Sequence, residues 1–359
     1  MIAILLLALL AGPAWGETIL LASPRALVCQ ASPDAEFVLD NGELRPLRGR
    51  FSFSPPGEPA LEPRISIPRD AEPGGAARVQ VRSADVLDSL SVQLTDPRGK
   101  PVGRASVFRV AVQGQGDAWA ALVGVPSTAV PGQYVMEVKA SAGDRTCLLR
   151  SSLAVTEKAF ASETIDLSST LSALRTTADP RKTEEALALL RVLSAPHPEA
   201  LFEQGAFSMP LSAGWRQTAA YGDKRRYRYA DGAADQTVHN GIDMAAPAGS
   251  PVSASGKGRV VLAGDRIMSG KTLVLEHLPG LFSIYYHMSE ILVKEGDILA
   301  AGQALGRVGQ TGLATGPHLH WEVQVLGTAV DPLGLVRRPV LDTEAAFEDI
   351  QVTVESEGR

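Results

Sequence analysis

Four of the six histidines in this 359-residue chain fall in three short segments that could together hold and use a metal ion. With one nearby aspartate, the candidate set is His239, Asp243, His287, His318 and His320. A catalytic zinc ion takes three protein ligands and leaves its fourth position to water. An H-x-x-x-D segment and an H-x-H segment can supply three ligands and still leave two imidazoles for proton transfer. The chemistry that this set predicts is metal-assisted hydrolysis.

The spacing within each segment indicates the backbone that carries it. Gly241 lies between His239 and Asp243, which argues against a helix that presents both ligands four residues apart. We therefore expect a strand or a loop that curves around the metal. His318 and His320 are two residues apart, so on a strand both point to the same face. One could bind the metal while the other faces the bound water, and the spacing alone leaves open which does which.

Long, ordered sequence segments surround these residues and carry a family resemblance. They are Tyr221–Arg225, His239–Val252, Gly258–Val261, Tyr286–Met288, Val293–Asp297 and Gly309–Glu322. Together they resemble the lysostaphin-type zinc endopeptidases, the LytM-domain proteins that cut peptidoglycan cross-links. The resemblance extends over roughly a third of the chain, and it is far more specific than an isolated H-x-H pair.

The resemblance implies a role for each candidate residue. His239, Asp243 and His320 correspond to the ligands of one Zn²⁺ ion, and His287 and His318 to the catalytic histidines. We expect His318 to be the general base that takes a proton from the attacking water. His287 would then hold the water or stabilise the oxyanion, and an exchange of these two roles remains open.

Other histidines and tyrosines receive more ordinary interpretations. We expect His277 to be a hydrogen-bonded turn residue and His197, between two prolines, to lie in a surface loop. Tyr286 should alternate away from its catalytic neighbour and pack in the core. Tyr227 and Tyr229 precede the first ligand and could line the cleft.

Composition and charge narrow the class of protein. The chain is 45% hydrophobic and 21% charged, which is typical of a soluble globular protein with room for two domains. Its net charge of -6 gives no electrostatic footprint for nucleic acid. The one basic stretch, Lys224–Arg228, is local and suggests a solvated loop or a substrate rim.

The first residues predict export. Residues 1–16 begin with an apolar run too short to span a bilayer and end in Ala14-Trp15-Gly16, which suits a signal peptidase. No later segment is apolar enough to cross a membrane. We expect a protein of the periplasm or cell envelope, or a secreted one. An uncleaved anchor or a buried N-terminal strand is the alternative for the apolar run.

The two cysteines, Cys29 and Cys147, bracket one candidate domain. In an exported protein such a pair predicts a disulfide. Closing so long a loop would contribute about 4–5 kcal/mol in the chain-entropy model. The alternative is two unpaired, buried thiols.

Periodicity and turn residues predict a mainly β chain in several parts. Residues 17–157 contain short strands such as Val107–Val112, Ala118–Val123 and Gln133–Lys139, and suggest an immunoglobulin-like β-sandwich. Residues 208–340, rich in glycine and short strands, predict an antiparallel β-sheet domain, and the resemblance implies that this is the LytM-type peptidase domain.

Two segments flank that peptidase domain. Residues 158–207 read as a helical connector, with Asp179 as N-cap, Pro180 in the first turn, and leucines at 187, 190 and 193. Residues 341–359 are rich in acidic side chains and predict a flexible tail.

The sequence therefore predicts an exported zinc endopeptidase that hydrolyses peptide bonds in peptidoglycan stems or cross-links. Three other classes remain open: a non-catalytic regulator of cell-wall amidases, a wall-binding module, and a secreted protease acting on proteins. The sequence does not identify a regulatory partner in the envelope. If the domains are modular, residues from about Phe207 to Pro339 should suffice for hydrolysis.

Overall fold

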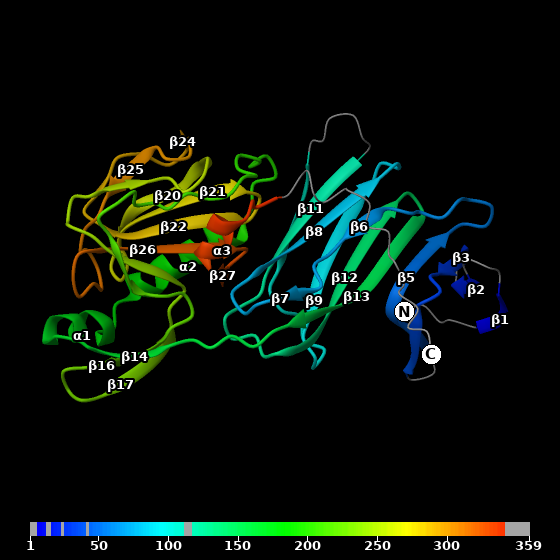
Figure 1. Cartoon of the computed structure of the whole chain (residues 1–359), viewed down its shortest axis with the longest axis horizontal. Helices are drawn as coiled ribbons and strands as arrows, with labels where there is room; N and C mark the ends of the chain where they lie inside the picture. Colours follow the sequence, from blue (N-terminus) through cyan, green and yellow to red (C-terminus); the bar gives the residue numbers. More distant parts are fainter. Residues whose placement is uncertain (1–5, 12–15, 23–24, 41–42, 111–116, 342–359) are drawn as a thin grey trace.

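The computed structural model of the chain describes residues 6–11, 16–22, 25–40, 43–110 and 117–341. It is mainly β, as predicted, and three helices lie among these residues. Figure 1 shows two lobes, one made of β1 to β13 and the other of the later strands with all three helices. The predicted acidic tail lies outside the described residues apart from Leu341, which is buried.

The N-terminal lobe contains two sheets that enclose a hydrophobic core. Its strands are β1 (Leu6–Ala11), β2 (Gly16–Ala22), β3 (Arg25–Ala31), β4 (Glu36–Asp40), β5 (Glu43–Ser54), β6 (Arg64–Ser66), β7 (Asp70–Ala71), β8 (Ala76–Ser83), β9 (Ser89–Thr95), β10 (Ala105–Arg109), β11 (Asp117–Gly124), β12 (Gly132–Ala142) and β13 (Arg145–Val155). One sheet has the order β1-β2-β3-β5-β13-β12-β9 and the other β10-β11-β8-β6. On β12, Tyr134, Met136 and Val138 are buried on one face, as their alternation predicts. The immunoglobulin-like assignment stays a prediction.

Strand β11 connects the two lobes, because one of its faces is buried in the core of each lobe. Ala121 and Val123 point into the N-terminal core, whereas Ala120 and Leu122 pack with Phe108 of β10 in the core of the C-terminal lobe. A strand buried on both faces has a nearly continuous apolar sequence. The run over 118–123 therefore marks an interface between lobes as well as a strand.

The predicted disulfide is wrong, because Cys29 and Cys147 are free and buried. They lie on β3 and β13, which flank β5, so their strands are about 10 Å apart, beyond disulfide reach. Their partners on β5, Phe53 and Ser52, are consecutive residues, so the two thiols also point to opposite faces of the sheet. Burial raises the pKa of the Cys29 thiol to about 11. The alternative of two unpaired, buried thiols matches the structure.

Within the apolar run predicted to be a leader, residues 6–11 form strand β1, which pairs with β2, and residues 1–5 and 12–15 lie outside the described residues. This pairing does not test cleavage, so the signal peptide remains a prediction. Among the described residues, no helix is both long and apolar enough to span a bilayer.

The connector contains a strand as well as helices, which corrects the purely helical interpretation. It comprises β14 (Ser162–Asp166), α1 (Ser169–Thr176) and α2 (Pro180–Ser194). Helix α2 begins as predicted, with the Asp179 side chain accepting a hydrogen bond from the backbone of Arg181. Of the three predicted leucines only Leu193 is buried, while Leu187 and Leu190 are exposed. The buried face is instead one that carries residues 189, 192 and 193 against β20 and its neighbours.

The C-terminal lobe is built on one large antiparallel sheet. Its elements are β15 (Arg216–Ala219), β16 (Lys224–Arg228), β17 (Ala234–Val238), β18 (Gly241–Ala245), β19 (Pro251–Ser253), β20 (Gly258–Arg266), β21 (Gly270–Leu278), β22 (Leu281–Met288), β23 (Glu290–Ile291), β24 (Ile298–Leu299), β25 (Ala304–Arg307), β26 (His318–Val325), β27 (Thr328–Val330) and α3 (Pro332–Arg337). The sheet has the order β15-β18-β26-β22-β21-β20-β24, and a smaller sheet has the order β14-β16-β17. The connector strand β14 thus belongs to this lobe, and it pairs in parallel with β16.

The two faces of the large sheet have different tasks. Ile242, Trp321 and Tyr285 are neighbours across β18, β26 and β22 and point into the hydrophobic core. The residues one step along these strands must point to the other face. That second face carries the candidate site.

Candidate metal centre and active site

Three neighbouring strands bring the candidate side chains together in one row. Asp243 of β18 pairs in register with His320 of β26, which pairs with Tyr286 of β22. His239 lies two residues before β18 and reaches the same row. The sheet places groups that are about 80 residues apart in sequence next to one another.

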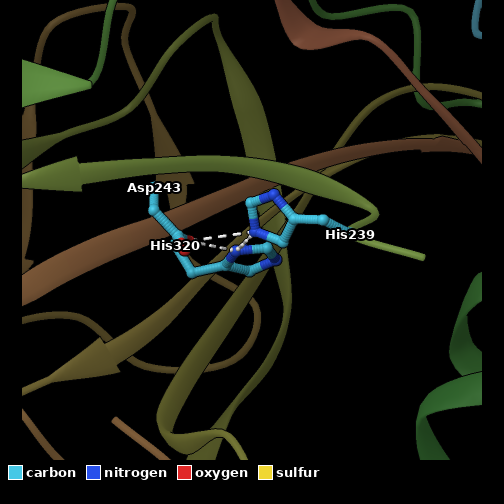
Figure 2. Close-up of side chains that lie close together, drawn as sticks. All are labelled: His239, Asp243 and His320. Atoms are coloured by element: carbon cyan, nitrogen blue, oxygen red, sulfur yellow. Dashed lines mark hydrogen bonds and ion pairs between the residues drawn. The ribbon is translucent and has the colours of Figure 1, made fainter. Parts of the chain in front are cut away.

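His239, Asp243 and His320 form a compact, buried cluster whose ligand atoms all lie within 4.8 Å of one another (Figure 2). His239 Nε2 lies 2.8 Å from His320 Nδ1 and 3.1 Å from Asp243 Oδ1. His320 Nδ1 lies 2.7 Å from the same carboxylate oxygen. Two imidazole nitrogens and one carboxylate oxygen therefore converge on one point.

The other polar atom of each candidate ligand is already held by a neighbour. His239 Nδ1 lies 2.7 Å from the carbonyl oxygen of Ala220, and His320 Nε2 lies 3.1 Å from Glu322 Oε1. Arg225 donates to Asp243 Oδ2 over 2.5 Å. Such partners fix the orientation of ligand side chains and direct one atom of each toward a metal.

The donor set and its spacing fit a tetrahedral ion such as zinc. With ligand distances of about 2.0–2.1 Å, such an ion separates its ligand atoms by roughly 3.3 Å. The measured separations of 2.7–3.1 Å are slightly shorter, so a small outward movement of the side chains would admit the ion. One carboxylate and two imidazoles, with room left for a water molecule, make the set of a catalytic site.

The electrostatics of the cluster favour a cation. Burial lowers the pKa of His320, but its hydrogen bonds to Asp243 and Glu322 outweigh this effect and raise the pKa to about 9. Burial raises the pKa of Asp243, and the contacts with His239 and His320 more than reverse it, so the net pKa is lowered. The Asp243 carboxylate is thus ionised, and its negative charge stabilises a cation bound next to it.

His318 and His287 lie beside the cluster with matching hydrogen bonds. His318 Nδ1 lies 2.8 Å from the carbonyl oxygen of Gly316, and His287 Nδ1 lies 2.8 Å from that of Thr311. Since a carbonyl can only accept, each Nδ1 carries the proton and each Nε2 is left with a lone pair. His318 Nε2 is 3.8 Å from Asp243 Oδ1. The ring centres of His287 and His318 are 4.8 Å apart.

Both imidazoles are held neutral. Burial, followed by the charges of His318 and His320, lowers the pKa of His287 to about 3. Burial is also the main cause of the lowered pKa of His318. A neutral imidazole with a free Nε2 can accept a proton, so both side chains have the form that a general base requires.

The backbone turns at His287, and Tyr286 both packs in a core, as predicted, and lines the cavity. His287 has a φ of 60°, a left-handed conformation that is rare outside glycine. The twist breaks the alternation of β22, so both neighbouring side chains line the same cavity. The Tyr286 ring lies 5.2 Å from that of His320, and its hydroxyl is 3.3 Å from Glu322.

The cluster opens into a cavity of about 460 Å³. All five predicted site residues line it, together with Tyr286, Glu322 and several residues of the smaller sheet. Three further lining residues come from the connector: Ile165, Leu167 and Arg175. A segment starting at Phe207 therefore lacks part of the wall of this cavity.

The remaining candidates lie where their contacts explain them. His277 is not in a turn but fully buried on β21, where Nδ1 contacts the carbonyl of Lys257 and Nε2 contacts Ser283 Oγ. His197 is half-buried and contacts Glu276 over 2.5 Å. Neither residue reaches the metal cluster.

The basic stretch and its tyrosines belong to the cleft wall. Residues 224–228 form strand β16 rather than a loop, and Tyr227 lines the cavity as suggested. Tyr229 does not line it and instead donates to Asp235 over 2.7 Å.

Three features of the site escaped prediction. Glu322 lies two residues after His320, and strand alternation could have placed it on the same face. Arg225 could have been identified from the basic stretch only with knowledge of its partner Asp243. The connector strand gave no signal, because its pairing with β16 joins residues about 60 positions apart.

Comparisons with known proteins agree with this geometry. Residues 237–332 match the family model described as peptidase family M23. The chain is 37% identical over 124 residues to the peptidoglycan DD-endopeptidase ShyA of Vibrio cholerae. The matched region covers 34% of this chain and 28% of that protein. It is 39% identical over 98 residues to the DD-carboxypeptidase/endopeptidase Mpg of Neisseria meningitidis, covering 27% of this chain and 23% of that protein. The chain thus spans about a quarter of the length of these relatives.

A similar solved structure is a putative peptidase M23 from Pseudomonas aeruginosa. It is 28% identical, with a TM-score of 0.46, and the match covers 74% of this chain and 93% of that one.

Proposed function

We propose that this protein is a zinc-dependent endopeptidase acting on peptidoglycan, since residues 237–332 match the model of peptidase family M23 and resemble the LytM type. Its substrate would be a peptide bond in a stem peptide or a cross-link. The observation that carries the proposal is the convergence of His239, Asp243 and His320 beside two neutral imidazoles in one cavity. The similarity to ShyA, a peptidoglycan DD-endopeptidase, supports the choice of substrate.

In this proposal the three clustered side chains hold the ion and two others handle protons. A bound zinc ion would act as a Lewis acid toward the scissile carbonyl and acidify a water molecule. His318 accepts the proton of the attacking water through Nε2, because its Nδ1 is committed to the carbonyl of Gly316. The same imidazole can then deliver that proton to the leaving amine.

His287 complements His318 from the other side of the cavity. Its Nδ1 is held by the carbonyl of Thr311, so Nε2 accepts a hydrogen bond from the water and keeps it oriented for attack. Stabilising the oxyanion instead would require His287 to gain a proton during the reaction, as in the exchange of roles with His318. The left-handed backbone at His287 is the kind of strain that functional positions retain.

The alternatives differ in turnover. A non-catalytic amidase regulator or a wall-binding module would bind peptidoglycan without cleaving it, whereas five intact site residues support catalysis. A secreted protease acting on proteins would use the same groups on another substrate. Export to the periplasm or cell envelope is part of the proposal, since the substrate lies there.

The test is digestion of purified peptidoglycan by the full-length protein, with and without a chelator, followed by mass analysis of the muropeptides. The proposal predicts cross-linked dimers converted to monomers, or shortened stem peptides if the bond lies within a stem, with no loss of sugar–peptide linkages and no reaction in chelator. Binding without any new product would favour the regulator or the binding module. Cleavage of casein but not of muropeptides would favour the protein protease.

A further inference from the structure

The connector reaches the active-site cavity through a surface that we name the connector wall: Ile165, Leu167 and Arg175. All three side chains line the cavity that contains the metal cluster. Ile165 is half-exposed on β14, whereas Thr164, its neighbour in sequence, is exposed on the opposite face of that strand. The connector is therefore more than a tether between lobes.

Backbone pairing fixes the wall to the peptidase domain. Strand β14 pairs in parallel with β16 along its whole length, and this register places Ile165 beside Tyr227. Leu167 continues the pairing with a hydrogen bond from its N–H to the carbonyl of Arg228, over 2.9 Å. Tyr227 also lines the cavity, so these apolar and aromatic side chains form one continuous surface.

Helix α1 is held to the same sheet by Arg175. Its guanidinium binds Asp235 at 3.0 Å, donates to the Tyr229 hydroxyl at 3.1 Å, and lies 4.3 Å from the centre of the Tyr227 ring. Its charge is thus neutralised by a partner outside the cavity lining. Arg175 therefore holds the connector wall in position and does not present an unpaired charge to a ligand in the cavity.

The charged side chain of the connector on the Ile165 side of β14, Glu163, is also paired within the protein. Glu163 points to the same side of β14 as Ile165 and binds Arg225 over 2.7 Å, while Arg225 in turn binds Asp243. This chain of ion pairs satisfies the carboxylate and links the connector to a candidate metal ligand. What remains available to an occupant of the cavity is mainly the apolar surface of Ile165 and Tyr227, because Leu167 is almost fully buried.

We propose that the connector wall is a substrate subsite, which binds the apolar side chain of a peptide residue next to the scissile bond. This inference rests on the proposed function and deepens it. The surface shares one cavity with the metal cluster, so a peptide held at the metal by its scissile carbonyl extends along it. An aliphatic side chain would be removed from water against Ile165 and Tyr227.

Full-length variants at Ile165 test the subsite, with Thr164→Glu as the matched control on the other face of the strand. Ile165→Ala should reduce kcat/KM for soluble cross-linked muropeptides about tenfold, the usual effect of a lost contact in an apolar subsite. Ile165→Glu should reduce it further, and Ile165→Leu should restore it. Metal content and thermal midpoint should match the parent, since the side chain is half-exposed.

A binding measurement separates this inference from the proposed function. In a full-length His318→Ala background, which should bind without turnover, Ile165→Ala should weaken the binding of the same muropeptide about tenfold, and Thr164→Glu should leave it unchanged. Parental affinity in Ile165→Ala and Ile165→Glu would overturn the subsite whatever the turnover. An equal loss in Thr164→Glu, or a loss of metal in the Ile165 variants, would overturn it too. If Ile165→Ala weakens binding but the parent protein with His318 intact shows no turnover, the subsite stands and the proposed enzymatic function is rejected.

Discussion

Glu322 orients the imidazole of His320, a candidate metal ligand. It accepts from His320 Nε2 at 3.1 Å, and it is itself held by Gln324 at 2.8 Å. Because Nε2 carries the shared proton, Nδ1 is left to face His239 and Asp243. The carboxylate also makes the imidazole a stronger electron donor.

Replacing this carboxylate should weaken the metal site without removing a ligand. We expect Glu322→Gln to lower zinc affinity by about 10- to 100-fold, as the loss of a partner behind a ligand typically does. Competition with a chromophoric chelator measures the change. Glu290→Gln, at an exposed site on β23, is the control and should bind zinc like the parent. Unchanged affinity in Glu322→Gln would mean that His320 needs no such support.

The histidines should divide into two classes when they are substituted. His239→Ala and His320→Ala should lose both metal and activity, because each removes a ligand atom. His287→Ala and His318→Ala should retain metal yet lose about 100- to 10,000-fold in rate, the range of general acid–base groups. Elemental analysis and steady-state kinetics on the four proteins separate the classes. Metal loss in His318→Ala with retention in His320→Ala would show that these two roles are reversed.

At the scale of elements, the row of ligands depends on a close approach between β18 and β26. Gly241 pairs with Glu322 across these strands, and a Cβ added at Gly241 would lie 2.3 Å from the backbone oxygen of Trp321. Backbone cannot move away as a flexible side chain can. Gly241, which lies between the candidate ligands His239 and Asp243, is therefore required by packing.

Gly241→Ala should separate the two strands and disturb the metal cluster. We expect a clear fall in thermal midpoint and weaker zinc binding, since overpacking a well-packed site typically costs about 1–3 kcal/mol or more. Gly264→Ala on β20 is the matched control, because a Cβ there meets nothing within 4 Å. If both variants melt like the parent, the close approach does not constrain this position.

Strand β21 carries a buried histidine that should make the fold sensitive to acid. Burial lowers the pKa of His277 to about 4, from about 6.5 in an unfolded chain. Between these values the unfolded state binds more protons, so stability is lost as pH falls from about 6.5 toward about 4. The loss attributable to this residue is roughly 3 kcal/mol.

The comparison of wild type with His277→Asn isolates that contribution. The fall in thermal midpoint between pH 7 and pH 5 should be smaller in the variant, which has no imidazole to protonate. Parallel curves for the two proteins would show that other groups control the acid response.

Many elements could be predicted because their signals are local. Alternation identified the buried face of β12, and an aspartate followed by a proline marked the start of α2. Alternation also placed Tyr286 in a core, but not at the cavity beside His287, because the left-handed backbone at His287 is set by its surroundings rather than by its own propensity. The buried face of α2 was also misjudged, since the helix packs according to the shape of the sheet beneath it.

For the molecule as a whole, sequence reasoning predicted which candidate residues would come together, but not which distant segments would surround them. The ligand segments are short and contiguous, so their residue types could be recognised directly. The disulfide failed because bracketing a domain says nothing about which face of a sheet a cysteine occupies. The interface formed by Phe108 and Leu122, and the wall formed by β14, depend on pairing between distant segments, for which the sequence carries no local signal.

These long-range contacts revise the modular expectation. The segment from about Phe207 to Pro339 holds every candidate catalytic group, but it lacks the connector wall and would expose the apolar surface that β10 and β11 cover. The full-length chain is therefore the unit on which the chemistry should be measured.

The most direct test of the central claim is a zinc titration of the metal-stripped, full-length protein during hydrolysis of a cross-linked muropeptide dimer. We predict no hydrolysis without metal, a linear rise in rate, and a plateau at about one zinc per chain, because His239, Asp243 and His320 form one ligand set. His239→Ala should show no rise at the same zinc concentrations. Full activity in the stripped protein, or an identical titration of His239→Ala, would contradict the account.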